Sequence, residues 1–316
     1  MRTVTPIGTP TALRGVLRRN EPLARHTSWR VGGPARYFYQ PADIADLAAF
    51  LRQLPAQEPV LWLGLGSNLL VRDGGVAGTV IAVATVLNRL ERDGDNVVRA
   101  DAGVPCAKVA RFCARHGMLG AEYLAGIPGT LGGALAMNAG AFGGETWERV
   151  VAVETLDRHG ELRVRSPQDF RVGYRSVEGP PGEWFVAGHL RLAPGDPRTG
   201  SERIKELLAQ RGMNQPTGQP SCGSVFRNPP GDYAARLIEQ SGLKGARIGG
   251  AAVSAKHANF ILNTGGASAA DIEALIQQVI ETVERLHAVR LQTEVRIVGE
   301  PAAAGTPTRI SAEVRQ

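Results

Sequence analysis

Aromatic residues and long apolar runs are both scarce in this chain of 316 residues. Phe, Trp and Tyr make up only 5% of it, and no Lys/Arg stripe alternates with them, so little is available for stacking nucleic-acid bases. The longest aliphatic stretch, residues 80–87, has the length of a strand, and the N-terminus lacks the apolar segment of a signal peptide. We therefore expect neither a nucleic-acid nor a membrane partner.

Disulfide and metal-ligand patterns are also missing. The three cysteines, Cys106, Cys113 and Cys222, form no CxxC pair, and the six histidines show neither HExxH nor Cys/His ligand spacing. An odd number of isolated cysteines is typical of a reducing compartment. We expect a cytoplasmic protein without a metal site.

The composition does provide a core and a small positive excess. Hydrophobic residues make up 43% of the chain, and 36 Lys and Arg against 30 Asp and Glu give a net charge of +6. The charges are dispersed, which favours a small phosphorylated ligand over a nucleic acid. The length predicts two or three domains.

Apolar periodicity predicts helices alternating with strands in the first two-thirds of the chain. One helix is expected after Asp43, which can cap it, and another before Gly117, which can end it. Their apolar faces are Ile44, Leu47, Ala48 and Leu51 in the first, and Val104, Val109, Phe112 and Cys113 in the second.

A change of composition near residues 192–200, rich in proline and glycine, predicts a domain limit. We place a first domain at 15–193, with subdomains 15–84 and 85–193, then a second domain at 194–300 and a disordered tail at 301–316. In the second domain we expect a capped helix at 201–213 and a long helix from 267 running directly into a strand at 289–297. The apolar face predicted for the long helix is Ile272, Leu275, Ile276, Val279, Ile280, Val283 and Leu286.

The first of two glycine-rich stretches runs from Gly64 to Gly75. It fails the dinucleotide fingerprint, because Leu69 stands where the third glycine belongs. The residues from Gly64 to Asn68 still offer closely spaced N–H groups, a hydroxyl and an amide that could bind an anion. A tight turn, with serine and asparagine selected for turn geometry, explains them equally well.

The second stretch, residues 126–144, holds seven glycines, more than the close packing of a helix on a sheet requires. Pro128, Gly129 and Thr130 can begin a helix whose N-terminus faces a pyrophosphate. We expect a flat, phosphorylated cofactor to approach this backbone closely.

Ser224 follows a glycine in SCGSVFRNP, residues 221–229. It is not on a nucleophile elbow, because Cys222 and Phe226 stand where that motif has glycines. No histidine lies nearby in sequence, and nothing else in the chain supports a catalytic triad.

Seven motifs, in the same order along nearly the whole chain, resemble those of the UDP-N-acetylenolpyruvoylglucosamine reductases, flavoenzymes of peptidoglycan precursor synthesis. They are HTSWRVGGPA, LGLGSNLLVRDGGVAG, AGIPGTLGGALAMNAGAFGGE, FRVGYRS, QPSCGSVFRNP, AAVSAKHANFILN and EVRIVGE. The resemblance implies an α+β protein, in which a vanillyl-alcohol-oxidase-type (PCMH-like) FAD-binding fold of two α/β subdomains precedes an α+β substrate domain. The short segment after Tyr174 is similar to the second, loop-less type of the family.

The resemblance implies a two-step reaction. NADPH reduces FAD, and hydride then passes to UDP-N-acetylglucosamine enolpyruvate to give UDP-N-acetylmuramate. Ser224 matches the family's proton donor, since a carbanion is basic enough to take a serine proton without a histidine. Arg175 and Glu294 match its catalytic arginine and glutamate, which stabilise charge near the substrate carboxylate. From the residues alone, a surface salt bridge for Arg175 and a pair of Glu294 with Arg290 or Arg296 are the simpler interpretations.

The resemblance also assigns the binding residues. For the substrate they are Asn228, Arg227, Tyr174 and His257, although a buried structural role explains His257 and nearby Asn259 equally well. FAD should be bound non-covalently, since neither glycine stretch contains histidine or cysteine. A monomer is expected.

The competing functions are an FAD-dependent sugar or alcohol oxidase of the same fold and a non-catalytic nucleotide-binding protein. The residues assigned to FAD are Gly64, Gly66, Ser67, Asn68, Pro128, Gly129, Thr130, Gly133 and Asn138.

Overall fold

A computed structural model describes residues 13–84 and 86–303 of the chain. Contacts divide the protein into two compact units, each built from separate parts of the sequence. Among the described residues, unit 1 contains 13–19, 37–64, 78–84 and 86–209, and unit 2 contains 20–36, 65–77 and 210–303. The domain limits expected from the sequence stay a prediction, and most of the expected tail lies outside the described residues.

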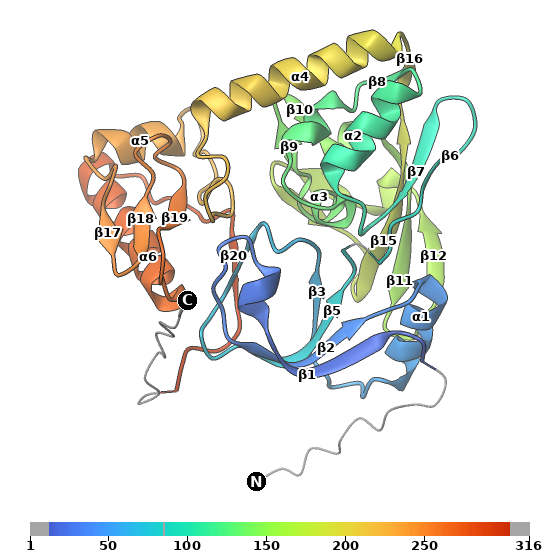
Figure 1. Cartoon of the computed structure of the whole chain (residues 1–316), viewed down its shortest axis with the longest axis horizontal. Coiled ribbons are helices and arrows are strands. Elements are labelled where there is room, and N and C mark those ends of the chain that lie inside the picture. The colour runs from blue at the N-terminus through green and yellow to red at the C-terminus, as the bar shows by residue number, and fades with distance from the viewer. Residues whose placement is uncertain (1–12, 85, 304–316) are drawn as a thin grey trace, which may run out of the picture. The chain divides into compact units, whose positions relative to one another are not determined.

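A five-stranded antiparallel sheet in the order β12-β11-β15-β7-β6 forms the centre of unit 1. Helices α2 (Cys106–Arg115) and α3 (Leu131–Met137) lie on one side of it (Figure 1). The buried core between them includes Val98, Val109, Leu135, Val153 and Leu190. The strands are β6 (Leu90–Arg92), β7 (Val97–Asp101), β11 (Val150–Asp157), β12 (Leu162–Arg165) and β15 (Glu183–Arg191).

A second sheet has the strand order β1-β2-β5-β3, with β3 and β5 parallel. Helix α1 (Ile44–Gln53) begins as the sequence predicts, because the Asp43 side chain accepts a hydrogen bond from the Asp46 N–H at 2.8 Å. Its predicted apolar residues Leu47 and Leu51 are buried. The strands are β1 (Val16–Pro22), β2 (Pro34–Gln40), β3 (Val60–Leu63) and β5 (Val76–Ala82).

Short hairpins and turns complete unit 1. The strand pairs are β8 (Met118–Leu119) with β16 (Ala193–Pro194), β9 (Gly140–Ala141) with β10 (Gly144–Glu145), and β13 (Arg171–Gly173) with β14 (Ser176–Glu178). Single turns of 3₁₀ helix lie at Leu23–His26 in unit 2 and at Glu122–Gly126, Thr146–Glu148 and Pro167–Asp169 in unit 1.

In unit 2, α6 (Ala269–His287) packs on a small antiparallel sheet and on α5 (Ala234–Gln240). Ser268 and Asp271 form a capping box at its start. The predicted apolar face is buried except for Leu286, which lies in the last turn of α6 and is 50% exposed. The sheet consists of β17 (Arg247–Ile248), β18 (Ala251–Val253) and β19 (Ile261–Asn263).

Two sequence expectations are wrong in this half of the chain. Helix α4 (Pro197–Asn214) starts before Ser201, whose hydroxyl bonds the Pro197 carbonyl from within the helix instead of capping it. The last strand, β20, is only Arg296–Val298, paired in parallel with β4 (Leu69–Val71). Ala288 ends α6 in a left-handed conformation, and between it and β20 the described chain forms only an isolated bridge of Thr293 with Phe226.

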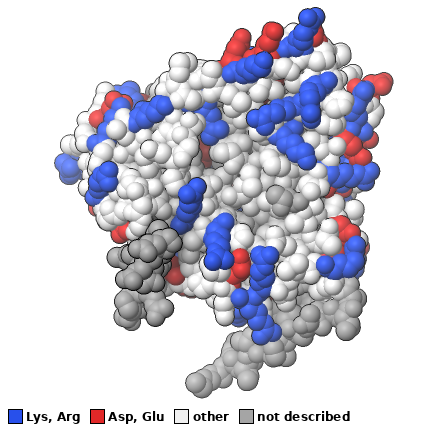
Figure 2. Space-filling view, viewed as in Figure 1, with Lys and Arg blue, Asp and Glu red and all other residues white. Residues whose placement is uncertain are grey.

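Figure 2 shows Lys and Arg spread over one face among uncharged residues rather than gathered in a single patch. Within residues 13–84 and 86–303, no helix is long and apolar enough to cross a membrane.

Candidate active site

Ser224 lies in a segment of unit 2 that Asn259 holds along one side. The Asn259 carbonyl accepts a hydrogen bond from the Val225 N–H at 2.9 Å. Its side chain accepts from the Phe226 N–H at 2.9 Å and donates to the Phe226 carbonyl at 2.8 Å. Asn259 is only 3% exposed, and both atoms of its side-chain amide are hydrogen-bonded to the backbone of Phe226. It is therefore a structural residue that fixes the segment carrying Ser224.

Glu294 lies on the other side of the same segment. Phe226 and Thr293 form an antiparallel bridge, and the Glu294 N–H donates to the Val225 carbonyl at 2.7 Å. Glu294 therefore precedes β20 instead of lying on the polar face of a continuous strand, as the sequence suggested. The fold nevertheless places its backbone beside the residue that follows Ser224.

The turn at Gly66 and Ser67 has the properties of an anion site. Gly66 has a left-handed φ of +61°, and a Cβ there would lie 2.1 Å from the His26 carbonyl oxygen, so only glycine fits. Among the described residues, the N–H groups of Gly66 and Ser67 have no hydrogen-bond acceptor. Gly66 is buried and Ser67 partly buried, and two N–H groups without an acceptor side by side are suited to binding an anionic group.

The second glycine stretch, in unit 1, only partly matches the expected helix site. Helix α3 begins after Thr130, but the N–H groups of Leu131 and Gly132 each donate to carbonyls of residues 102–104 at 2.9 Å. Those two donors are therefore used inside the protein. A Cβ on Gly64 would lie 2.6 Å from Thr130 Oγ1, so the end of β3 and the start of α3 approach each other here.

Gly132 and Gly133, adjacent in α3, differ in whether close packing explains why they are glycines. A Cβ on Gly132 would lie 2.7 Å from the Cβ of Ala102, so Gly132 is required by packing. A Cβ on Gly133 would meet only Thr130 Oγ1, at 3.9 Å. Packing does not explain Gly133, which leaves open backbone for a cofactor beside Gly129 and Thr130.

Asn138 ends α3 with a left-handed φ of 47° and uses its side chain within unit 1. Its Nδ2 donates to Glu145 Oε2 at 2.8 Å and to the Gly173 carbonyl at 3.1 Å. Its Oδ1 accepts from the Trp147 N–H at 3.1 Å. Asn138 thus ties three loops together, and its contact with FAD stays a prediction.

Arg175 occupies the two-residue turn between β13 and β14, with a left-handed φ of 53°. Its Nη1 donates to the Asn138 carbonyl at 3.2 Å and its Nη2 to the Gly140 carbonyl at 3.0 Å, while Glu145 Oε1 lies 3.6 Å from Nη1. The side chain is only 15% exposed. Arg175 is therefore held in place within unit 1, and a surface salt bridge does not describe it.

The residues assigned to the substrate differ in their surroundings. Tyr174 is 48% exposed and lies under the Arg175 guanidinium, and Asn228 Oδ1 accepts from the N–H of Ala234 at the start of α5. Arg227 Nε is buried without an acceptor among the described residues. Burial lowers the pKa of His257 below its usual 6.5, so this ring is neutral near pH 7.

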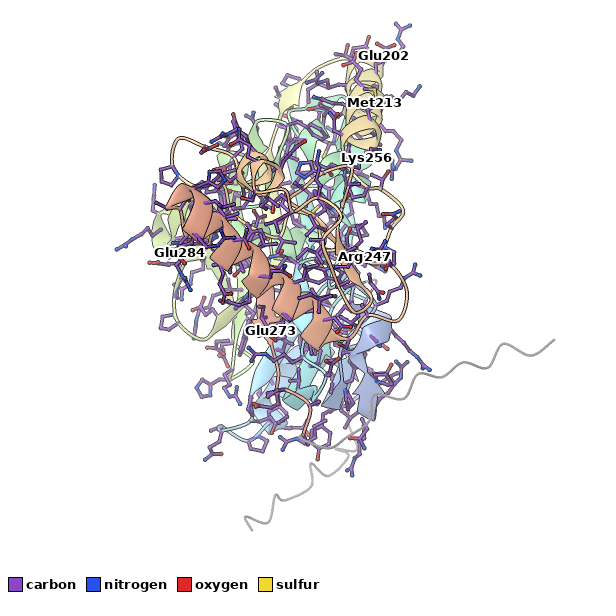
Figure 3. All side chains as sticks on the ribbon, turned by 90° about the vertical axis from the view of Figure 1, so that its left-hand side faces the viewer. Glu202, Met213, Arg247, Lys256, Glu273 and Glu284 are labelled. Carbon is purple, nitrogen blue, oxygen red and sulfur yellow. The ribbon has the colours of Figure 1, made fainter. Side chains whose placement is uncertain are left out.

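A cavity of about 680 Å³ in unit 2 lies apart from these residues. Loop 216–220 and the sheet β17-β18-β19 line it, and Arg247 and Lys256 on its lining are visible in Figure 3. Its polar groups bond within the protein: Lys256 Nζ donates to the Gly212 carbonyl, and Thr264 Oγ1 to the Gly250 carbonyl. Among the described residues, no predicted site residue lines this cavity, and no cluster of His, Cys, Asp or Glu could hold a metal ion.

Comparison with known proteins identifies the family to which the chain belongs. The family "UDP-N-acetylenolpyruvoylglucosamine reductase, C-terminal domain" matches residues 215–298, and the family "FAD binding domain" matches residues 35–165. The UDP-N-acetylenolpyruvoylglucosamine reductase of Alkalilimnicola ehrlichii is 65% identical over 286 residues, which is 90% of this chain and 96% of that protein. The chain belongs to this reductase family.

Other members agree. The reductase of Methylococcus capsulatus is 64% identical over 290 residues, covering 92% of this chain and 95% of that protein. The crystal structure of UDP-N-acetylenolpyruvylglucosamine reductase (MurB) from Thermus caldophilus is similar with a TM-score of 0.78 and 34% identity, covering 90% of this chain and 99% of that one. The predicted FAD-binding fold, the family and FAD as cofactor are confirmed.

Two residues that hold the site of this reductase were not singled out from the sequence. Glu145 contacts both Asn138 and Arg175, and Gln292 accepts a hydrogen bond from the Arg227 N–H at 2.9 Å. Glu145 ends the glycine motif on which the resemblance rests, so an acidic residue closing that motif was an available signal. Gln292 gave none, because its backbone makes the contact.

Proposed function

We propose that this reductase converts UDP-N-acetylglucosamine enolpyruvate to UDP-N-acetylmuramate with NADPH as reductant. We place it in the cytoplasm, as a monomer that supplies peptidoglycan precursors for cell shape and division. The observation that carries the proposal is the pairing of the Ser224 segment with the Glu294 segment, inside the region that matches the reductase C-terminal domain.

Ser224 and Glu294 have complementary roles in the proposed chemistry. Bound flavin, once reduced by NADPH, would supply the hydride for the terminal carbon of the enolpyruvyl group. Ser224 then gives its hydroxyl proton to the carbon beside the carboxylate, which is basic enough to take it. Glu294 stabilises the enol-like charge that precedes this proton transfer. The backbone bond between Glu294 and Val225 supports this assignment, since it fixes both residues in one local frame.

Arg175 holds the substrate carboxylate. A guanidinium is planar and carries five N–H donors, so bonds to the carbonyls of Asn138 and Gly140 fix the plane in which it meets a carboxylate. A fixed cation is most useful where negative charge grows during the reaction. The short segment from Arg175 to the start of β15 supports the loop-less type of the family.

The UDP diphosphate is assigned to Arg227 and Asn228. The buried Arg227 Nε without an acceptor among the described residues supports this, because an unpaired buried donor is costly unless a ligand pairs it. Tyr174 and His257 complete the proposed substrate contacts. The neutral state of His257 suits a hydrogen bond to an uncharged group better than one to a phosphate.

An anaerobic two-step titration tests the function. The purified protein should be yellow, NADPH should bleach it, and the UDP-enolpyruvyl sugar should then restore the colour. NADH serves as the comparison for the first step and UDP-N-acetylglucosamine, which lacks the double bond, for the second. An enzyme bleached by a sugar or alcohol and recoloured only by oxygen would be an oxidase, and the proposal would be wrong.

Non-covalent flavin attachment is tested by acid precipitation. Because neither glycine stretch contains a histidine or cysteine, all of the flavin should appear in the supernatant. Yellow colour that persists in the washed, denatured pellet would contradict this assignment.

A further inference from the structure

Asn68 bonds the main chain at and near Glu294. Its Nδ2 donates to the main-chain carbonyl of Glu294 at 3.1 Å. Its own carbonyl accepts from the N–H of Arg296 at 3.0 Å, where the parallel pairing of Leu69 with Arg296 begins. All of these residues belong to unit 2.

Glu294 is therefore held at both of its peptide groups. Its N–H donates to the Val225 carbonyl at 2.7 Å, and its carbonyl accepts the Asn68 amide. The direction of a side chain follows from the backbone torsions that such bonds fix. One of the two bonds comes from a side chain, so a substitution at Asn68 removes that bond and leaves the backbone bond to Val225 in place.

We propose that Asn68 is a positioning residue for Glu294, so that the turn assigned to the flavin and the carboxylate that stabilises the enol-like charge belong to one hydrogen-bonded structure. The inference rests on the proposed function, because it takes Glu294 to act on the substrate. It differs from the role predicted for Asn68 as an FAD ligand. An FAD ligand affects both half-reactions, whereas a positioning residue for Glu294 affects only the second.

The size of the effect follows from the geometry of catalysis. A displacement of a catalytic group by about 1 Å can cost roughly 100-fold in rate. Loss of one of the two hydrogen bonds on the Glu294 peptide permits a displacement of this order or smaller. We expect the second half-reaction to slow by roughly 10- to 100-fold.

The primary experiment uses Asn68→Ala in the full-length, flavin-loaded protein. The ratio of flavin to protein and the rate of flavin reduction by NADPH should stay within about twofold of wild type, while reoxidation by the UDP-enolpyruvyl sugar slows. Asn68→Ser is a second variant, since serine suits the same turn but is too short to reach the Glu294 carbonyl. Loss of flavin, or equal slowing of both half-reactions, in the variant that folds would overturn the proposal.

A matched control separates positioning from general loosening of unit 2. Asn263 Nδ2 also donates to a backbone carbonyl, that of Trp29, at 2.9 Å, and Asn263 has no proposed part in the reaction. Asn263→Ala should lower the thermal stability without changing the ratio of the two half-reaction rates. If it changes that ratio as Asn68→Ala does, the effect is not specific to Glu294 and the proposal fails.

A double-mutant cycle gives the decisive readout. If Asn68 acts through Glu294, Asn68→Ala should have little further effect once Glu294→Gln has removed the carboxylate. Multiplying effects in the double variant would mean that Asn68 acts elsewhere. The proposed function is tested separately by the wild type: if wild-type enzyme is not reoxidised by the sugar, the function is wrong, whereas a working wild type with an unaffected Asn68→Ala disproves this inference alone.

Discussion

Arg175 in unit 1 and the pair Ser224 and Glu294 in unit 2 are held by different parts of their residues. The Arg175 guanidinium itself bonds two backbone carbonyls and lies 3.6 Å from a Glu145 oxygen. The Ser224 and Glu294 segments are joined through main-chain groups. Changing the Arg175 side chain in unit 1 therefore removes the hydrogen bonds that hold it in place. Changing the side chain of Ser224 or Glu294 in unit 2 leaves the main-chain hydrogen bonds of the segment intact.

The largest expected effect is that of Ser224→Ala on the second half-reaction. Loss of a positioned general acid costs on the order of 10²–10⁴ in rate. Because backbone bonds hold the segment, flavin content, reduction by NADPH and melting temperature should match wild type. Stopped-flow absorbance of the flavin measures both steps, and Ser224→Cys, which keeps a transferable proton, should retain more activity than alanine. Wild-type reoxidation in the alanine variant would remove Ser224 from the mechanism.

The next effect tests the turn that carries the open N–H groups. Gly66→Ala combines a left-handed φ of +61° with a Cβ 2.1 Å from a backbone oxygen, so the turn must deform and FAD affinity should fall more than tenfold. Gly94→Ala is the control, since Gly94 has a φ of +85° and open space around it. Equal flavin retention in the two variants, measured after dialysis, would show that the turn does not shape the flavin site.

A smaller and mixed effect is expected for Arg175→Lys. Lysine keeps the charge but cannot reproduce the fork that bonds two carbonyls. Because the guanidinium makes the hydrogen bonds that hold the side chain in place, this variant should lose about 1–3 kcal/mol of unfolding free energy. The rate of the second half-reaction should also fall roughly tenfold. Arg171→Lys on the same hairpin is the control, with a side chain 86% exposed. If urea denaturation finds Arg175→Lys as stable as Arg171→Lys, the contrast between the units does not hold.

Features that depend on residues close in sequence could be predicted, whereas features that depend on distant residues could not. The start of α1 could be predicted, because Asp43 caps a helix only a few residues away. The role of Asn138 could not, since its partners lie at residues 145, 147 and 173 and reach it only through tertiary folding. The final strand failed for a related reason. Alternating polarity indicates which side chains share a face, but a strand forms only where a neighbouring strand pairs with it. Here β4 pairs with only three residues, 296–298.

The smallest effect is expected at Cys222, two residues from Ser224. Burial raises the pKa of its thiol to about 12, so it stays protonated and unreactive across the neutral range. The sulfur lies 3.5 Å from the Leu69 carbonyl oxygen and 3.6 Å from that of Gly66, weak contacts that alanine loses at little cost. Cys222→Ala should change either half-reaction by less than about twofold. Rapid alkylation of Cys222 in the native enzyme at pH 8 would contradict this picture.

The parallel pairing of β4 with β20 has a consequence for how the protein is made. Residues 69–71 are synthesised about 230 residues ahead of their partners at 296–298. At about 5–20 residues per second, the early strand waits roughly 10–50 seconds for its neighbour. During that interval the Asn68 turn lacks the Glu294 carbonyl and the Arg296 N–H that bond it, so a nascent chain cannot complete unit 2 before residue 298 has been added. A ribosome that stalls before residue 296 leaves a chain in which this turn cannot be assembled.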